Sequence, residues 1–174
     1  TFPRYFERTF PSGMRSGTLS GWITIGPTVS ATGLYDYWIV HAINGDYATL
    51  QLRCSAGSCK FNIETNWNGS TAATTHSATE VTATTGASYW ISFYVDTRSG
   101  SNTAVATVYD STYTQVGSTI TTTMRGGNNL NTIRWGNNES GAESGSTSYM
   151  ENLIVTFTGN APTTVGPRET TLPG

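Results

Sequence analysis

The sequence predicts an all-β domain, a two-sheet antiparallel jelly-roll sandwich, and three observations lead to this expectation. Apolar and polar residues alternate along most of the 174-residue chain, which is the pattern of strands with one buried face. Turn residues interrupt the alternation about every 8–12 residues, too often for crossover helices. Only 11% of the residues are charged, against about 25% in ordinary domains, and Thr and Ser, which suit a pleated, half-solvated surface, take their place.

The expected strands of the first half each end at a turn signal. Pro11-Ser12-Gly13 and Gly26-Pro27 supply two of these signals, and Asn44-Gly45-Asp46 has the composition of a tight hairpin turn. Parity then places Leu50 and Leu52 on one buried face. The expected strands are 5–10, 19–25, 35–43, 48–54 and 60–65.

The clearest strand of the second half is 89–96. Its odd-numbered positions are apolar and face the predicted core, whereas Trp90 and Tyr94 lie on the opposite face. The other strands expected here are 80–85, 103–110, 115–123, 131–136 and 148–158. We therefore expect one sandwich over 1–158, followed by an extended tail or linker over 159–174, which holds three of the six prolines.

Charge and hydropathy exclude several classes of partner. The net charge is −2 and Lys60 is the only lysine, so the chain lacks the basic surface that binds nucleic acid. No apolar run reaches the roughly 18 residues of a transmembrane helix. We expect neither nucleic-acid binding nor membrane insertion.

The two cysteines, Cys54 and Cys59, flank a short Ser/Gly turn. A hairpin could bring them within disulfide range. Two buried thiols are the alternative, and a metal site is disfavoured because no second Cys or His pair lies nearby. A disulfide and a Thr-rich, low-charge surface both favour an oxidising location, secreted or exposed on a cell or virion.

Several segments together resemble the laminin G-like branch of the concanavalin A-like lectin/glucanase superfamily. They are the opening Tyr5-Phe6-Glu7-Arg8, the strand Ser88-Tyr89-Trp90-Ile91-Ser92-Phe93-Tyr94-Val95-Asp96 with its return Ala104–Asp110, and the closing pair Ile133-Arg134-Trp135-Gly136 and Tyr149–Val155. The resemblance covers residues 4–158. It implies two curved antiparallel sheets, with glycans contacting the concave sheet or its rim loops.

Enzymatic signatures are missing from the sequence. Glycosidases need a pair of carboxylates, and the acidic residues here are scattered. Polysaccharide lyases on this fold use Arg, Gln, His and Tyr; Arg53, Gln51, His41 and Tyr94 are of the right types, but the lyases' local motifs are absent. His41 is expected to be half-buried and satisfied by one hydrogen bond.

Aromatic residues are the leading candidates for a glycan site. Sugars stack on exposed rings while their hydroxyls find polar partners, and the chain has five Trp and nine Tyr. Trp67 is expected in a loop, and Trp38 and Trp135 in the core. The candidate ligand-binding residues are Trp67, Trp90, Tyr94, Trp22, Gln51, Arg53 and Arg134.

Two further features have ordinary alternatives. Asp96, Asn102 and Asp110 offer oxygen ligands for Ca²⁺, but these are also common turn formers; no other cofactor is expected. Asn68 and Asn138 begin N-glycosylation sequons, which matter only in a host with that pathway.

The sequence favours a non-catalytic, extracellular, lectin-like module that binds a glycan or polysaccharide. One alternative is a structural or assembly subunit of a virion, filament or cell surface, with copies of itself or other surface proteins as partners. The other is a polysaccharide-degrading enzyme, a lyase or glycoside hydrolase.

Overall fold

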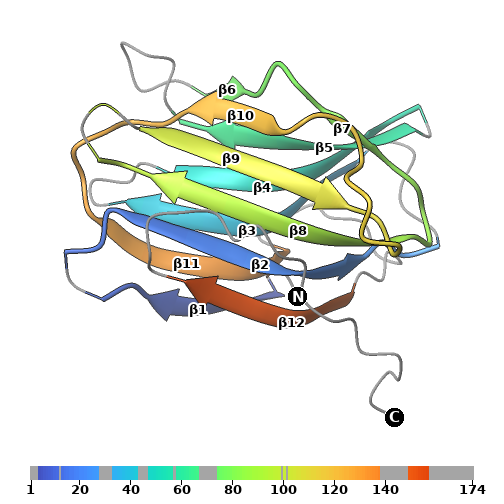
Figure 1. Cartoon of the computed structure of the whole chain (residues 1–174), viewed down its shortest axis with the longest axis horizontal. Coiled ribbons are helices and arrows are strands. Elements are labelled where there is room, and N and C mark those ends of the chain that lie inside the picture. The colour runs from blue at the N-terminus through green and yellow to red at the C-terminus, as the bar shows by residue number, and fades with distance from the viewer. Residues whose placement is uncertain are drawn as a thin grey trace.

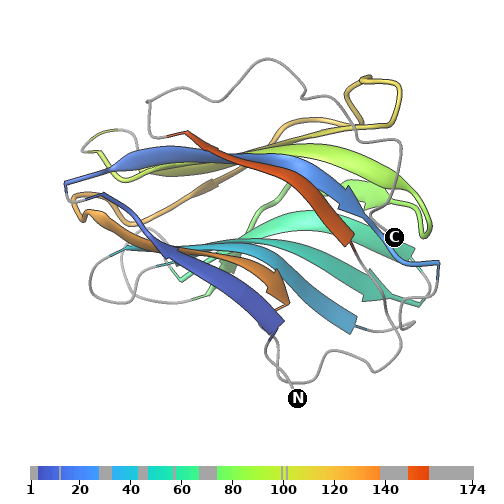
Figure 2. The same cartoon turned by 90° about the horizontal axis from the view of Figure 1, so that it is seen from below.

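The computed structural model is a sandwich of two antiparallel β-sheets packed face to face (Figure 1; Figure 2). This confirms the predicted fold class. The structure describes residues 4–11, 13–27, 33–42, 47–56, 58–66, 74–98, 100, 102–137 and 149–156. Within these residues there is no helix, and so no apolar helix long enough to cross a membrane. The expected tail over 159–174 lies outside them.

One sheet has seven strands in the order β1-β11-β3-β4-β5-β6, with β7 also paired to β5. Chain neighbours β3, β4 and β5 form successive hairpins, whereas β11 comes from far along the chain to lie between β1 and β3. The strands are β1 (Arg4–Thr9), β3 (Gly33–Ala42), β4 (Tyr47–Ser55), β5 (Ser58–Thr65), β6 (Thr75–His76), β7 (Val81–Ala83) and β11 (Leu130–Asn137).

The other sheet has five strands in the order β10-β9-β8-β2-β12. Its centre is the long β2·β8 pair, in which nine residue pairs run from Ser16↔Asp96 to Thr24↔Ser88. Figure 1 shows this sheet lying across the seven-stranded one, with β10 at one edge and β12 at the other. The strands are β2 (Ser16–Thr24), β8 (Ser88–Asp96), β9 (Thr103–Tyr109), β10 (Ile120–Thr123) and β12 (Tyr149–Thr156).

The core lies between the sheets and is built from the apolar half of each alternating strand. The predicted stripe of β8 is there, with Ile91, Phe93 and Val95 fully buried. Leu50 and Leu52 of β4 face it from the other sheet. Trp135 is 8% exposed and belongs to this core, as predicted.

A disulfide joins Cys54 and Cys59 at the tip of the β4–β5 hairpin, which confirms the predicted bond. The two cysteines are a register pair. Counting back from them, Leu52 opposes Phe61 and Leu50 opposes Ile63, so the buried face is continuous across the hairpin.

The three largest differences from the sequence prediction are in β2, β10 and β6. β2 begins at Ser16 because its first residues pair with the end of β8. The weak strand expected over 115–123 is formed only by Ile120–Thr123, since Gln115 makes a single bridge to Tyr109. The two-residue β6 was expected to be loop, and it pairs with Glu64 and Thr65.

Edge strand β12 is irregular. Its register against β2 shifts between Glu151 and Ile154, and Asn152 there has a positive φ of 53°. This is a β-bulge, in which one strand holds extra residues and bends. Leu153 and Ile154 beside it are 38% and 44% exposed.

Replacing both cysteines with Ala should lower the free energy of unfolding by about 2 kcal/mol, the loop entropy expected for so short a ring. The apolar pairs behind the tip should hold the register, so the fold should survive. Urea titration followed by circular dichroism measures this loss. An unfolded variant would mean that the disulfide, and not the apolar pairing, holds the hairpin.

Candidate functional site

The outer face of the seven-stranded sheet bears a group of polar side chains that contact one another. In β4 the inward positions are apolar, so alternation turns Tyr47, Thr49, Gln51 and Arg53 outward. In β5 the same rule turns Lys60, Asn62 and Glu64 outward. The disulfide-linked register places Gln51 opposite Asn62 and Thr49 opposite Glu64.

Glu64 is the centre of this group. One carboxylate oxygen, Oε1, accepts a hydrogen bond of 2.8 Å from the Tyr47 hydroxyl. The other, Oε2, accepts one of 3.1 Å from Gln51 Nε2. The Glu64 side chain is only 16% exposed, and these donors compensate the carboxylate for the water it has lost.

His76 completes the group from β6, where it is the register partner of Glu64. Its Nε2 lies 3.6 Å from Glu64 Oε2, and its side chain is 37% exposed. The imidazole is therefore held beside a carboxylate while remaining open to solvent. We refer to Tyr47, Gln51, Asn62, Glu64 and His76 as the Glu64 cluster.

The amides of Gln51 and Asn62 are unusual because they are buried and incompletely paired. Asn62 is fully buried, and neither its Oδ1 nor its Nδ2 has a hydrogen-bond partner in the described part of the chain. Gln51 Oε1 likewise has no hydrogen-bond partner among the described residues. Each such group costs about 1–3 kcal/mol, so the amides lower stability where they stand and are candidates for contact with a ligand.

Lys60, Arg53 and Arg134 are cations on this face, and two of them are ion-paired. Lys60 Nζ lies 3.0 Å from Glu80 Oε2. Arg134 Nε lies 2.6 Å from Glu7 Oε2. Arg53, which opposes Lys60 across the β4–β5 ladder, is exposed, and no ion pair joins it to another described residue.

The four residues that the sequence offered for a lyase, Arg53, Gln51, His41 and Tyr94, do not converge in this structure. Gln51 and Arg53 share the outer face of the seven-stranded sheet, and His41 pairs through its backbone with Tyr47. Tyr94, however, belongs to β8 and the five-stranded sheet. The outer faces of two packed sheets point in opposite directions (Figure 2), so Tyr94 cannot act with Gln51.

Two of the candidate tryptophans lie on the outer face of the five-stranded sheet but are buried. Trp22 is fully buried and Trp90 is 1% exposed. They are register partners and contact each other edge to face with ring centroids 5.8 Å apart. Neither ring face is open to solvent in this structure. Trp67, Asn68 and Asn138 lie outside the described residues.

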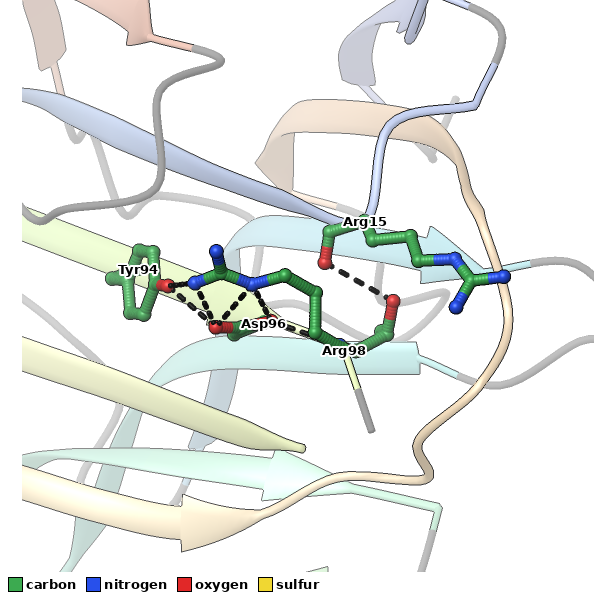
Figure 3. A network of polar contacts seen from close by, with 5 residues as sticks. Arg15, Tyr94, Asp96 and Arg98 are labelled. Carbon is green, nitrogen blue, oxygen red and sulfur yellow. Dashed lines mark hydrogen bonds and ion pairs between the residues drawn. The ribbon is translucent and has the colours of Figure 1, made fainter. Parts of the chain in front are cut away.

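Tyr94 and Asp96 belong instead to a network with Arg98 (Figure 3). Arg98 Nη2 lies 2.6 Å from Asp96 Oδ2, and Arg98 Nε donates to Asp96 Oδ1 at 3.0 Å. The Tyr94 hydroxyl donates to Asp96 Oδ2 at 2.7 Å. The network anchors the end of β8, where Thr97 also donates to the backbone oxygen of Arg15 at 3.1 Å.

The network fixes the protonation states of its members. Burial, and after it the hydrogen bond to Asp96, raises the pKa of Tyr94, so its phenol stays protonated at neutral pH and is a poor base. Burial alone would raise the pKa of Asp96, but hydrogen bonds from Arg98 and Tyr94 outweigh it and hold that pKa below its usual value.

The three candidate calcium ligands are not brought together. Asp96 pairs with Thr103 at the start of β9, whereas Asp110 follows the end of that strand, about 20 Å away for seven extended residues. Asp96 already binds Arg98, and Asp110 caps its own turn. No three His, Cys, Asp or Glu residues among those described are grouped as metal ligands.

Replacing Asp96 with Asn should remove part of the acid sensitivity of the fold. Because the folded-state pKa of Asp96 is depressed, its ionised form stabilises the protein above the unfolded pKa of about 3.9 and loses this effect as the pH falls through the folded value. Asp96→Asn should cost about 1–3 kcal/mol at neutral pH and flatten the acid limb of stability against pH. Urea titrations at a series of pH values across this range measure the effect. The prediction would be contradicted if the free energies of unfolding of the variant and the wild type fell equally steeply with falling pH.

Comparison with solved structures gives relatives in fold. An alginate lyase from Klebsiella pneumoniae superposes with a TM-score of 0.60 at 13% identity over 84% of this chain and 61% of the enzyme. The alginate lyase of Alteromonas sp. 272 gives 0.57 at 10% identity, covering 84% of this chain and 73% of the enzyme. The cellulose-induced protein Cip1 gives 0.50 at 12% identity, covering 83% and 69%.

These likenesses concern the fold alone, because all three identities are low. This chain spans about three fifths of the Klebsiella enzyme. No protein-family model and no curated protein sequence matches this sequence. The laminin G-like branch stays a prediction, whereas the jelly-roll sandwich that these structures share is the fold of this domain.

Proposed function

We propose that this domain degrades a polysaccharide, and that it does so as a lyase at the outer face of the seven-stranded sheet. The observation that supports the proposal is the Glu64 cluster, in which a solvent-accessible histidine and a tyrosine converge on one carboxylate beside two buried amides. The fold shared with alginate lyases supports the same class of substrate. A disulfide is consistent with work outside the cytoplasm.

The reaction of a lyase requires three functions, and the cluster has a group for each. The proton on the carbon beside a uronate carboxylate is removed, the bond from the neighbouring ring carbon to the glycosidic oxygen breaks, and a carbon–carbon double bond forms between the two carbons. Hydrogen-bond donors near the carboxylate make the proton more acidic. A base removes it, and an acid protonates the leaving oxygen.

His76 suits the role of base. Its Nε2 lies 3.6 Å from Glu64 Oε2, so in the proposed mechanism Nε2 faces the carboxylate and Nδ1 is the nitrogen that would accept the proton. This arrangement of a base held by an acidic side chain is common in catalysis. Tyr47 is proposed as the acid: Glu64 positions its hydroxyl, and the proton of that hydroxyl would turn from Glu64 to the leaving oxygen.

Asn62, Gln51 and Arg53 suit the substrate carboxylate. Asn62 Nδ2 makes no hydrogen bond to the described residues, but the side chain is fully buried, so a substrate would have to displace what covers it before either N–H could bind. Arg53 is on the same face two residues beyond Gln51, and its guanidinium could bind a carboxylate through two nitrogens. A glycosidase mechanism fits less well, because among the described side chains no second carboxylate contacts Glu64, and glycosidases use two.

His76→Ala should abolish cleavage of a uronate polymer while leaving the fold intact, because His76 is partly exposed and lies in a two-residue edge strand. The ultraviolet absorbance of the new conjugated double bond measures the product. Loss of a general base lowers kcat by about 10²–10⁴-fold. Alginate, polygalacturonate and glucuronan are suitable substrates.

The matched control is Glu80→Gln, which removes an ion pair on the same sheet away from the cluster. It should keep full activity. If the wild-type protein releases no unsaturated product from any of the three polymers, the lyase proposal is wrong. A kcat of His76→Ala within about tenfold of wild type would remove His76 from the role of base.

A non-catalytic glycan-binding site on the same face is the second candidate. It is favoured by the buried, unpaired amides of Gln51 and Asn62, which suit sugar hydroxyls as well as a carboxylate. The state of Glu64 favours it as well. Both of its carboxylate oxygens already accept hydrogen bonds from the cluster, so this carboxylate holds its neighbours in place instead of acting on a substrate.

Asn62→Leu tests whether the buried amide is kept for a ligand. Removing an unpaired buried polar side chain should raise the free energy of unfolding by about 1–2 kcal/mol, and it should weaken polysaccharide binding measured by calorimetry. Stability gained at the expense of binding is the usual mark of a functional site. A variant that is less stable with unchanged binding would show that Asn62 serves the fold.

A further inference from the structure

Tyr113 lies in the turn that follows β9, next to the outer face of the five-stranded sheet. Asp110 organises this turn: its Oδ1 accepts hydrogen bonds from Thr112 N at 2.8 Å, Thr112 Oγ1 at 2.7 Å and Thr114 N at 3.0 Å. The backbone closes it, with Tyr113 N donating to Asp110 O at 3.0 Å and Asp110 N donating to Thr114 O at 2.9 Å. The turn is therefore rigid.

The backbone of Tyr113 is strained. Its φ is +66°, in the left-handed region that suits Gly or Asn and is an outlier for a bulky side chain. A three-residue hairpin loop of this kind ordinarily places Gly at this position. A tyrosine kept where glycine would fit better indicates that the side chain has a use, since such strain gathers at functional sites.

The ring of Tyr113 is presented to solvent on a firm support. Its exposed fraction is 51%, the highest among the large hydrophobic residues described. One side contacts the buried Trp22, with ring centroids 6.0 Å apart and planes at 62°, and Trp22 in turn contacts Trp90. Three aromatic rings thus lie in series, and only the last is open.

Unpaired polar atoms lie along the strands of the same face. Trp90 Nε1 and Ser92 Oγ, two residues apart in β8, are buried and make no hydrogen bond with any described residue. Ser20 Oγ, on the register partner of Ser92, is in the same state. Because these atoms are buried, they do not reach a sugar on the open side of Tyr113, and the proposal below rests on the ring alone.

We propose that Tyr113 is the platform of a second carbohydrate site, which binds a neutral pyranose by stacking on the open side of its ring. This site lies on the opposite face of the sandwich from the Glu64 cluster and does not depend on the function proposed for that cluster. It would hold the domain on a neutral glycan while the other face remains free.

The charge of the turn favours a neutral sugar over an acidic one. Hydrogen bonds from Thr112, and after them the backbone of Thr114, hold the pKa of Asp110 below its usual value, so this carboxylate is ionised at neutral pH. A uronate placed on Tyr113 would be repelled by it, whereas a neutral ring would not. Stacking needs only the apolar C–H face of the sugar.

Fluorescence titration tests the proposal, because a ligand on Tyr113 should change the emission of the adjoining Trp22. The probes are neutral oligosaccharides of glucose, mannose, galactose and xylose, with oligoalginate for contrast. We expect a neutral oligosaccharide to bind wild type and Tyr113→Phe alike. Tyr113→Asn, which suits a left-handed turn but lacks the ring, should bind about tenfold more weakly without a lower midpoint of thermal unfolding.

Two results would overturn the proposal: no neutral oligosaccharide binds the wild-type protein, or Tyr113→Asn binds as well as wild type. A Tyr113→Asn variant that unfolds at a clearly lower temperature would also count against it, because the ring would then serve the fold. His76→Ala should keep the neutral-sugar site, so failure at this site and failure of the lyase proposal are separable.

Discussion

The Cys54–Cys59 disulfide and the register that it shares with the β4–β5 hairpin underlie the polar face of this protein. Side chains in a strand alternate between faces, so a slip of one residue would turn every outward side chain of a strand inward. The paired cysteines and the apolar pairs behind them prevent such a slip. They also bring Gln51 and Asn62 together and place Glu64 where Tyr47 and Gln51 can both reach it.

Much of the fold was predictable because it depends on alternation, which is local. The inward stripe of β8 and the core position of Trp135 follow from the sequence. Part of the Glu64 cluster was predictable too. If Cys54 pairs with Cys59 in an antiparallel hairpin, the same register pairs Thr49 with Glu64. His76 was not predictable, because a two-residue strand has no period, and its position depends on pairing with β5.

What alternation cannot tell is which sheet a strand joins. Tyr94 and Gln51 are both outward in their own strands, yet the topology puts them on opposite sides of the sandwich. Local pattern also did not reveal that Trp22 and Trp90 are buried, because a side chain that faces away from the core is not always exposed. The two outer faces that result differ in character: one centres on a carboxylate with its donors, the other on aromatic rings that contact one another edge to face.

The bulge in β12 has a consequence for how the domain behaves among its own copies. A low-charge, Thr-rich sheet that ends in a regular strand offers a continuous row of amide and carbonyl groups on which another chain can grow. Near Asn152 the ladder of β12 is interrupted and the strand bends. The bulge shortens the straight part of β12 to which another strand could add. It can therefore limit aggregation of a domain whose few charges repel other copies only weakly.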